Sequence, residues 1–338
     1  MMDDLGRMAK VSARSARRYQ FDTFAVGVSL PEGTQEREDE VRAELKLKGR
    51  ETVRTQTGGF VAFEVASALG KKVDKQRPDL TLLVNFDQES VQATSRSLYY
   101  FGRYSKPPGV SQRMELCKRC RGSGCRRCKG SGVEPKPSVE GLLSRRLSRE
   151  SGSDRTTFTW MGSEDRESRV YPPGRPFLVE VKNPFRRKVP RKLIARFRGG
   201  QVVVSGGRIL PAKPVRLPSF KFRTRIYGVT KSKVSGESLA DLRAAFVDAP
   251  VTFERPYDRP VTKTVHRARA ETDGRSIVID AVLDGGLPVK RFVSGELVSP
   301  SVSEVLKTEV RCRNFDICEV KETGVFEFAE IPRVEKKN

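Results

Sequence analysis

Four of the six cysteines in this 338-residue chain lie within twelve residues of one another. They follow a C-x2-C-x4-C-x2-C pattern: Cys117, Cys120, Cys125 and Cys128. Four thiolates that leave no ligand position open are typical of a structural zinc site. The lysines and arginines between them lower thiol pKa values and offset the charge of a zinc tetrathiolate. The pattern therefore predicts a structural Zn²⁺ ion, with an iron–sulfur cluster as the main alternative. Cys312 and Cys318 are expected to be buried thiols.

A glycine loop, Gly162-Ser163-Glu164-Asp165, carries the second group of candidate chemical residues. By itself, an aspartate on such a loop is usually a turn residue. The wider context is more specific, because Arg169 and then G-R-P-F-L-V-E-V-K-N-P, residues 174–184, follow the loop.

Residues 162–184 resemble the signature of the archaeal and eukaryotic tRNA pseudouridine synthases that act at positions 54 and 55 in the TΨC arm. That signature reads G-R-E-D-x-D-x-R, then G-R-P-F, an apolar strand and N-P. Residues 286–296 (GLPVKRFVSGE) are similar to the family's G-T-Y-I-K-E-F-V-x-G-D, and residues 300–306 (PSVSEVL) to its P-S-V-S-E-L-L. Residues 78–84, 100–104 and the paired cysteines resemble its N-terminal half, a THUMP-like RNA-binding domain with a zinc knuckle.

The resemblance implies a role for several residues. Asp165 is the catalytic aspartate, Lys290 pairs with it, and Tyr227 stacks on the target base and handles the proton at carbon 5. The implied substrate-binding residues are Tyr227, Val289, Arg169 and Arg175. Without the resemblance, Tyr227 also fits a core tyrosine and Lys290 an exposed lysine, each on a strand.

The chemistry suits a carboxylate, because isomerising uridine requires breaking the glycosidic bond, turning the base over and rejoining it through carbon 5. Asp165 can act as nucleophile at the anomeric carbon or as base at the adjacent carbon, and the sequence leaves both open. The chain departs from the family pattern at four positions: Ser163, Glu167, Pro288 and Glu296. These departures keep a second hypothesis, a catalytically degenerate tRNA-binding protein that assists RNA folding. A third, a zinc-dependent chaperone module like that of J-domain proteins, rests only on the glycine and cysteine spacing.

Composition favours a nucleic-acid partner. Lys and Arg number 65 and Asp and Glu 42, a net charge of +23, and the isoelectric point is about 10.1. The chain has a single histidine, His266, which argues against a histidine-based mechanism. We find no apolar run of membrane-spanning length, no secretory signal and no phosphate-loop or dinucleotide motif. We therefore expect a cytoplasmic enzyme that binds tRNA through the TΨC arm, without an organic cofactor, a small-molecule cofactor or a membrane; no protein partner is predicted.

The element pattern predicts an α+β protein with mixed sheets. Expected strands lie at residues 24–28, 80–86, 90–93, 177–181, 202–204, 277–279 and 326–328, and expected helices at 34–47, 60–69, 139–149 and 236–246. The expected domains are a basic flexible arm (1–20), a THUMP-like RNA-binding domain that includes the zinc knuckle (21–140, knuckle 117–132) and a pseudouridine synthase catalytic domain (141–338). Residues 99–104, Y-Y-F-G-R-Y, fit either a base-stacking platform or an aromatic strand that packs on a core.

Overall fold

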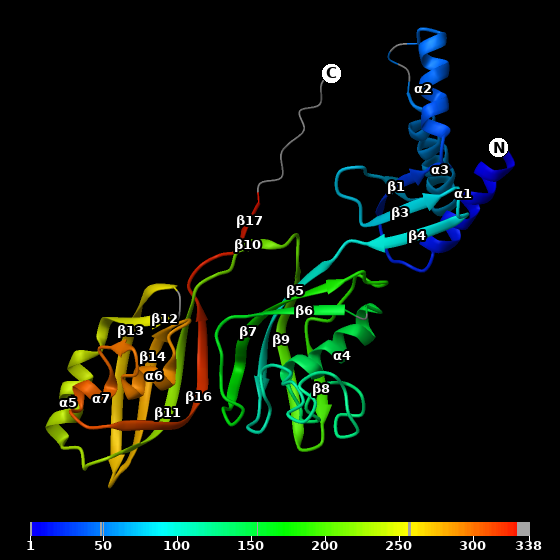
Figure 1. Ribbon diagram of the computed structural model, residues 1–338. Helices are drawn as coiled ribbons and strands as arrows, with labels where there is room; N and C mark the ends of the chain where they lie inside the picture. The colour runs from blue at the N-terminus through cyan, green and yellow to red at the C-terminus, as the bar shows by residue number, and fades with distance from the viewer. Residues whose placement is uncertain (1, 48, 50, 154, 256–257, 330–338) are drawn as a thin grey trace. The chain divides into compact units, whose positions relative to one another are not determined.

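Two compact units make up the part of the chain that the structure, a computed structural model, describes: residues 2–47, 49, 51–153, 155–255 and 258–329. Unit 1 runs to Leu98 and also takes in residues 147–156 and 180–189, and unit 2 holds the rest. Both units combine helices with β-sheets (Figure 1). The sheets contain parallel and antiparallel pairs, so the expected α+β class with mixed sheets is confirmed.

Unit 1 contains a four-stranded sheet in the order β2-β1-β3-β4. These strands are β1 Thr23–Ser29, β2 Lys72–Val73, β3 Leu80–Asn85 and β4 Ser90–Ser95. β1 is parallel to β2 and β3, and β4 is antiparallel to β3. Leu80, Leu82 and Val84 of β3 are fully buried whereas Thr81 and Leu83 are exposed, the alternation that a sheet with one covered face requires.

Three helices belong to unit 1: α1 Met2–Ala16, α2 Thr34–Glu44 and α3 Val53–Leu69. The Thr52 side chain caps α3 by accepting a hydrogen bond from the Thr55 amide. Gly70 ends α3 with a left-handed φ of 63°, directly after the helix expected at residues 60–69. α2 has no buried residue.

The first helix corrects the flexible arm expected for residues 1–20. Met8, Ala9, Ala13 and Ala16 are buried and recur at helical spacing, so they form one face of α1. This face packs into the core of unit 1 with Phe24, as the contacts of α1 with α3, β3 and β4 show. The basic residues at Lys10 and Arg14 lie on the exposed side of the helix and gave the segment its arm-like composition.

An 11-stranded sheet runs through unit 2, in the order β15-β12-β13-β14-β11-β16-β7-β5-β9-β8, with β6 paired to β7. Its strands are β5 Leu98–Lys106, β6 Arg155–Trp160, β7 Val170–Lys182, β8 Leu193–Phe197, β9 Gly200–Leu210, β11 Phe220–Thr230, β12 Val247–Arg255, β13 Asp258–Asp273, β14 Ser276–Asp284, β15 Val298–Ser299 and β16 Val310–Glu322. A separate pair joins β10 Pro214–Arg216 to β17 Glu327–Phe328. The neighbouring strands from β15 to β16 and from β5 to β8 are antiparallel, whereas β16 and β7 are parallel.

The remaining helices are α4 Val139–Ser151, α5 Gly236–Ala245, α6 Val289–Ser294 and α7 Val302–Val305. The P-S-V-S-E motif builds α7 through a capping box between Ser301 and Glu304. The Ser303 hydroxyl donates to the Val293 carbonyl at 2.8 Å and so ties α7 to the end of α6. Lys290 therefore lies on a short helix held by this motif, not on a strand.

The aromatic run at residues 99–104 forms part of β5 and belongs to the core. Tyr100, Phe101 and Tyr104 are at most 1% exposed, so their rings pack inside and do not offer a surface for bases. Tyr104 and Trp160 meet edge to face with ring centroids 5.8 Å apart. Of the two interpretations, the packing one is confirmed.

The compact units also differ from the expected domain division at residue 140. The cysteine segment 117–132 falls in unit 2, together with the glycine loop at 162–165. Among the described helices, none has both the length and the hydrophobicity that crossing a membrane requires.

We predict that α1 contributes to the stability of unit 1. Met8→Ala removes a side chain that is 1% exposed and should lower the free energy of unfolding by about 2–5 kcal/mol, because it leaves a cavity. Lys10→Ala, on the exposed side of the same helix, should change it little. Chemical denaturation followed by circular dichroism measures both, and equal, negligible effects would contradict a packed α1.

Candidate functional site

The glycine loop and the interior face of the large sheet in unit 2 together line a hollow of 430 Å³. Ser163, Asp165 and Lys290 line it, and its apolar lining includes Phe222 and Phe315. The further apolar lining residues are Leu283, Leu287, Val289 and Ile317. A hollow of this size that combines apolar walls with polar and charged groups is typical of a small-molecule or nucleoside site.

One ion pair dominates this pocket. Nζ of Lys290, on α6, lies 2.9 Å from Oδ2 of Asp165, and about a third of the aspartate side chain is exposed. Oδ2 itself is buried and receives no hydrogen bond of good geometry in the described part of the chain, so its contact with Lys290 is a charge contact. The pair expected between these residues is present.

A buried lysine holds the backbone of the Asp165 loop. Lys106, the last residue of β5, is 3% exposed. Its Nζ donates to three main-chain carbonyls: 3.2 Å to Asp165, 3.3 Å to Arg166 and 2.6 Å to Ser168. Burial lowers the pKa of Lys106 to about 8, although the neighbouring carboxylates oppose this shift. All three donors of the ammonium group thus serve the loop.

A second buried contact fixes the residue before Asp165. The Glu164 side chain is fully buried, and its Oε2 lies 3.0 Å from Nη1 of Arg175. The Tyr104 hydroxyl donates to Glu164 Oε1 at 2.6 Å, and Gln112 Nε2 donates to Tyr104, to Glu164 and to the Gly162 carbonyl. Burial, followed by the charge of Glu164, raises the pKa of Tyr104 well above its usual range. A buried pair with these extra hydrogen bonds resists loss of either partner.

Tyr227 is not in this pocket. Side chains of β11 alternate, and Phe222 and Thr224 face the hollow with Asp165. Tyr227 has the opposite parity and lines a different hollow with Arg223 and Arg225. Its hydroxyl donates to Asp316 Oδ2 at 3.4 Å. The structure therefore corrects the expectation that Tyr227 forms a wall beside Asp165; the aromatic lining there comes from Phe222 and Phe315.

The two arginines expected to bind substrate do not present free guanidinium groups to the pocket. Arg175 is 4% exposed and engaged by Glu164, by the Met161 carbonyl at 3.1 Å and by the Phe222 ring at 5.0 Å. Arg169 is exposed and lies over the Tyr171 ring, outside the pocket lining. Val289 lines the pocket as expected.

The positions that depart from the family pattern are all near or at the surface. Ser163 is exposed at the pocket, Pro288 caps the start of α6, and Glu167 and Glu296 are exposed. None of them is part of the buried contacts that hold Asp165.

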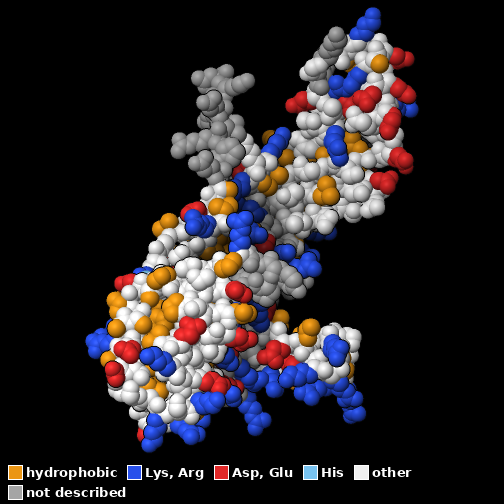
Figure 2. Space-filling model, turned by 60° about the vertical axis from the view of Figure 1, so that its left-hand side comes forward, with side chains coloured by type: hydrophobic (Ala, Val, Ile, Leu, Met, Phe, Trp, Pro, Cys, Tyr) orange, Lys and Arg blue, Asp and Glu red, His pale blue; other side chains and the backbone are white. Residues whose placement is uncertain are grey.

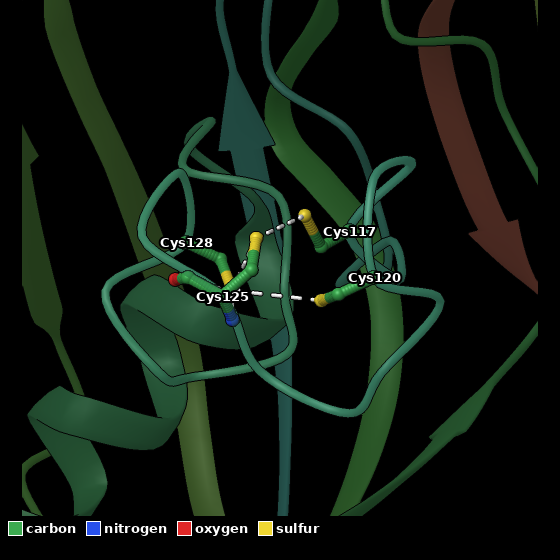
Figure 3. Close-up of side chains that lie close together, drawn as sticks. All are labelled: Cys117, Cys120, Cys125 and Cys128. Atoms are coloured by element: carbon green, nitrogen blue, oxygen red, sulfur yellow. Dashed lines mark hydrogen bonds between the residues drawn. The ribbon is translucent and has the colours of Figure 1, made fainter.

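The four clustered cysteines come together on two loops of unit 2 (Figure 3). Their sulfur atoms all lie within 4.8 Å of one another. Neighbouring sulfurs are 3.8 Å apart between Cys117 and Cys125, and 3.7 Å apart between Cys120 and Cys128 and between Cys125 and Cys128. A tetrahedral ion with bonds of about 2.3 Å to sulfur places its ligands about 3.8 Å apart. The geometry therefore fits one four-coordinate metal ion.

Main-chain amides support the cysteine cluster. The amides of Cys125 and Gly132 donate to Sγ of Cys128 at 3.1 and 3.3 Å. Burial raises the pKa of Cys128, but these hydrogen bonds outweigh it and bring the pKa down to about 6. A thiolate at neutral pH is the form that binds metal. The other two cysteines, Cys312 and Cys318, are half-buried, less than the sequence predicted.

Sequence reasoning missed Lys106 and Cys312 beside Asp165, and Tyr104 and Gln112 beside Glu164. Lys106 carries no local signal, because its three acceptors lie about 60 residues along the chain. Cys312 has its pKa raised to about 11, mainly by burial, with opposing influences from Lys290 and Asp165. The glutamate of the G-S-E-D loop was the one available signal for the Tyr104 and Gln112 contacts.

Two family models match the chain. The model described as "Pus10 THUMP domain, archaeal" matches residues 8–85, and that described as "Pus10, C-terminal" matches residues 99–201. The first match covers β1 to β3, α2, α3 and most of α1, ends before β4, and agrees with the expected THUMP-like domain.

Curated relatives match over most of their length. The tRNA pseudouridine synthase Pus10 of Cenarchaeum symbiosum (strain A) is 34% identical over 310 residues, which cover 90% of this chain and 75% of that protein. The protein of the same name from Nitrosopumilus maritimus (strain SCM1) is 30% identical over 322 residues, 95% and 84% of the two chains. That from Pyrococcus furiosus is 26% identical over 336 residues, 95% and 82%.

A solved structure, "Crystal Structure of a Cbf5-Nop10-Gar1 Complex", is 9% identical with a TM-score of 0.35. It covers 65% of this chain and 48% of that one. A similarity of this size supports no inference about this chain.

We predict that Lys106 limits the motion of the Asp165 loop. Lys106→Met removes a donor from three carbonyls. Those of Asp165 and Arg166 still accept from the amides of Ser168 and Gly109, so that of Ser168 is the one left without a donor among the described residues, a loss of about 1–3 kcal/mol in local stability. Amide hydrogen exchange in residues 163–168 should rise about 5- to 150-fold by mass spectrometry, since exchange there requires the loop to open. Lys213→Met, at an exposed lysine of the same unit, is the matched control. Unchanged exchange in the Lys106 variant would show that other contacts hold the loop.

Proposed function

The chain belongs to the Pus10 family of tRNA pseudouridine synthases, and from this we propose that it isomerises uridine 55, uridine 54 or both in the TΨC arm of tRNA, with Asp165 as the catalytic aspartate. The observation that supports this best is the Asp165–Lys290 pair, 2.9 Å apart, beside an apolar pocket. A flipped pyrimidine needs such a pocket to leave the base stack.

The reaction rearranges bonds without a net change in atoms or electrons. The bond from N1 of uracil to the anomeric carbon breaks, and a bond from carbon 5 to the same carbon forms. The proton on carbon 5 is lost and N1 gains one. The reaction therefore calls for no oxidant, reductant or organic cofactor.

Asp165 acts in this scheme as nucleophile at the anomeric carbon or as base at the adjacent carbon. Both routes use the carboxylate, and the Lys290 ammonium lies 2.9 Å from its Oδ2. Lys106 and the Glu164–Arg175 pair hold the loop at its backbone and at the preceding residue. Such fixed placement of a reacting group contributes to catalysis by avoiding reorganisation.

The pocket lining gives the freed base an apolar surface on which to turn. Phe222 and Phe315 offer aromatic faces, and Val289 begins the helix that carries Lys290. Ring-to-ring contact is the interaction expected for a base extruded from RNA. Arg175 contributes by holding Glu164 and not by binding phosphate, since its guanidinium group is buried.

The four clustered cysteines hold one structural zinc ion in this proposal. Their sulfur spacing matches a tetrahedral site, and four protein ligands leave no position for substrate. The zinc orders the loops of residues 117–132, because few side chains of this segment are buried.

The net charge of +23 fits a polyanionic substrate, and phosphate contacts supply affinity without sequence information. Lys and Arg side chains gather along the lower edge of the face drawn in Figure 2. Discrimination of the target uridine then depends on the shape of the folded arm and on the pocket at Asp165.

We predict that Asp165→Asn binds tRNA but does not isomerise it. The substitution keeps the size of the side chain and removes the charge, so turnover should fall by at least about a thousandfold. Release of tritium from uridine labelled at carbon 5 measures turnover, and filter binding measures affinity, which should stay within about threefold. Glu167→Gln removes an exposed carboxylate two residues away and should leave both nearly unchanged. Normal turnover by Asp165→Asn would remove Asp165 from the mechanism.

We predict about one zinc per chain by elemental analysis. Cys120→Ser should reduce the zinc content to near zero and increase hydrogen exchange in residues 117–132, because the loops lose their common ligand. Cys312→Ser, outside the cluster, should keep the zinc. A purified chain that contains no metal yet shows the same exchange in these loops would rule out the structural role.

A further inference from the structure

The outer face of three neighbouring strands carries an arginine-rich surface that the proposed reaction does not use. The hydrogen-bond register of β11, β14 and β13 sets side chains in rows across this face. Directly opposed residues of adjacent strands point to the same side of a sheet. The rows are Arg223, Val282 and Arg267; then Arg225, Asp280 and Arg269; then Tyr227, Val278 and Glu271.

Together with α5, this face forms a hollow of 870 Å³, which we call the arginine hollow. Its lining contains five arginines, one of them Arg243 from α5, and only two carboxylates, Asp280 and Glu271. The residues of β11 that face the Asp165 pocket, Phe222 and Thr224, have the opposite parity. The arginine hollow and the Asp165 pocket are therefore on opposite faces of the same strands.

Ion pairing inside the chain satisfies only part of this charge. Arg223 pairs with Asp280 at 2.9 Å, and Arg267 lies 3.9 Å from the same carboxylate. Among the described residues, no carboxylate lies within 4.0 Å of the three other guanidinium groups, Arg225, Arg243 and Arg269. A solvated sheet face usually mixes opposite charges across strands, because like charges in one row repel. Three unpaired guanidinium groups in one hollow are the arrangement that an anion with several charges stabilises.

Among the described residues that line the arginine hollow, Tyr227 is the only aromatic one. The residue is partly buried, and its hydroxyl is used by Asp316, so the ring is the part left to contact a ligand. Arg223, Arg225 and Tyr227 are every second residue of β11, so each lies about 7 Å from the next along the strand. This spacing is close to that of successive nucleotides in an extended strand. An aromatic ring beside arginines is the usual platform for unpaired bases.

We propose that the arginine hollow is a second RNA-binding site, in which a single-stranded RNA segment contacts the unpaired arginines through its phosphates and stacks one base on Tyr227. The segment is distinct from the one that enters the Asp165 pocket, because the two sites face opposite sides of the sheet. This inference goes beyond the proposed reaction: it requires RNA binding but no chemistry at Asp165.

The test measures binding of a short fluorescent oligoadenylate RNA to the full-length protein by anisotropy, at several salt concentrations. Oligoadenylate contains no uridine, so its binding is independent of isomerisation. Arg225→Gln, Arg243→Gln and Arg269→Gln together should reduce the slope of log K against log salt by about 2, the value for three phosphates of a single strand. Tyr227→Ala should weaken binding about 5- to 150-fold, and Tyr227→Phe, which keeps the ring, should bind like the wild type.

Three matched controls separate this site from general charge and from catalysis. Lys192→Gln, Arg196→Gln and Arg198→Gln together remove the same charge from exposed positions outside the hollow and should leave the slope unchanged. Asp165→Asn should bind oligoadenylate normally, so a failure of the proposed reaction is recognised separately. Inorganic phosphate should displace the RNA no better than chloride at equal ionic strength.

Each opposite result overturns the proposal. The proposal fails if the triple variant of the hollow binds RNA like the wild type, or if the triple control variant loses as much affinity. Either result would show that the arginine hollow is an ordinary solvated face of the sheet. Selective displacement by phosphate would indicate a small-anion site. Normal RNA affinity with lost turnover in Tyr227→Ala, at saturating tRNA, would return Tyr227 to the chemistry at Asp165.

Discussion

The position of Asp165 depends on one buried ammonium group. Lys106 places its Nζ among three carbonyls of the loop that carries Asp165, and no other described side chain contacts that backbone at so many points. Removing a charged group from water is costly, and the three carbonyls offset this cost only when the loop has its present shape. The loop conformation and the burial of Lys106 therefore require each other. Glu164, locked by Arg175 and Tyr104, restrains the neighbouring side chain in the same way.

Because side chains alternate along a strand, the Asp165 pocket and the arginine hollow lie on opposite faces of one sheet. On the interior face, Phe222 and Phe315 line a pocket that also contains the Asp165–Lys290 and Glu164–Arg175 pairs. On the outer face, arginines of β11 and β13 surround Tyr227. A pocket with aromatic walls and a fixed carboxylate suits bond rearrangement on a single base, whereas an open cationic surface suits a phosphate backbone. A single residue of register shift would exchange the two sets.

The sequence predicted the candidate catalytic and metal-binding residues better than the contacts that hold them in place. The motifs around Asp165, Lys290 and the cysteines are local, so their pairing and spacing were readable without the fold. The position of Tyr227 was predicted wrongly, because the face on which its side chain lies depends on its position in the strand alternation. A sequence motif also does not show the bulges between β11 and β16, one of which is next to Tyr227. The α1 helix was missed because small alanines form most of its buried face, while basic residues dominate its composition. Lys106 was unpredictable because its partners are distant in sequence.

The central claim is that this chain converts a uridine of the TΨC arm at the Asp165 pocket. The most direct measurement is carbodiimide mapping of an unmodified tRNA transcript after incubation with the purified protein. The account predicts a new carbodiimide-dependent stop at position 54, 55 or both, formed without any added organic cofactor, and no stop elsewhere in the transcript. A protein that binds the transcript tightly at the same concentration yet leaves every uridine unmodified would contradict it.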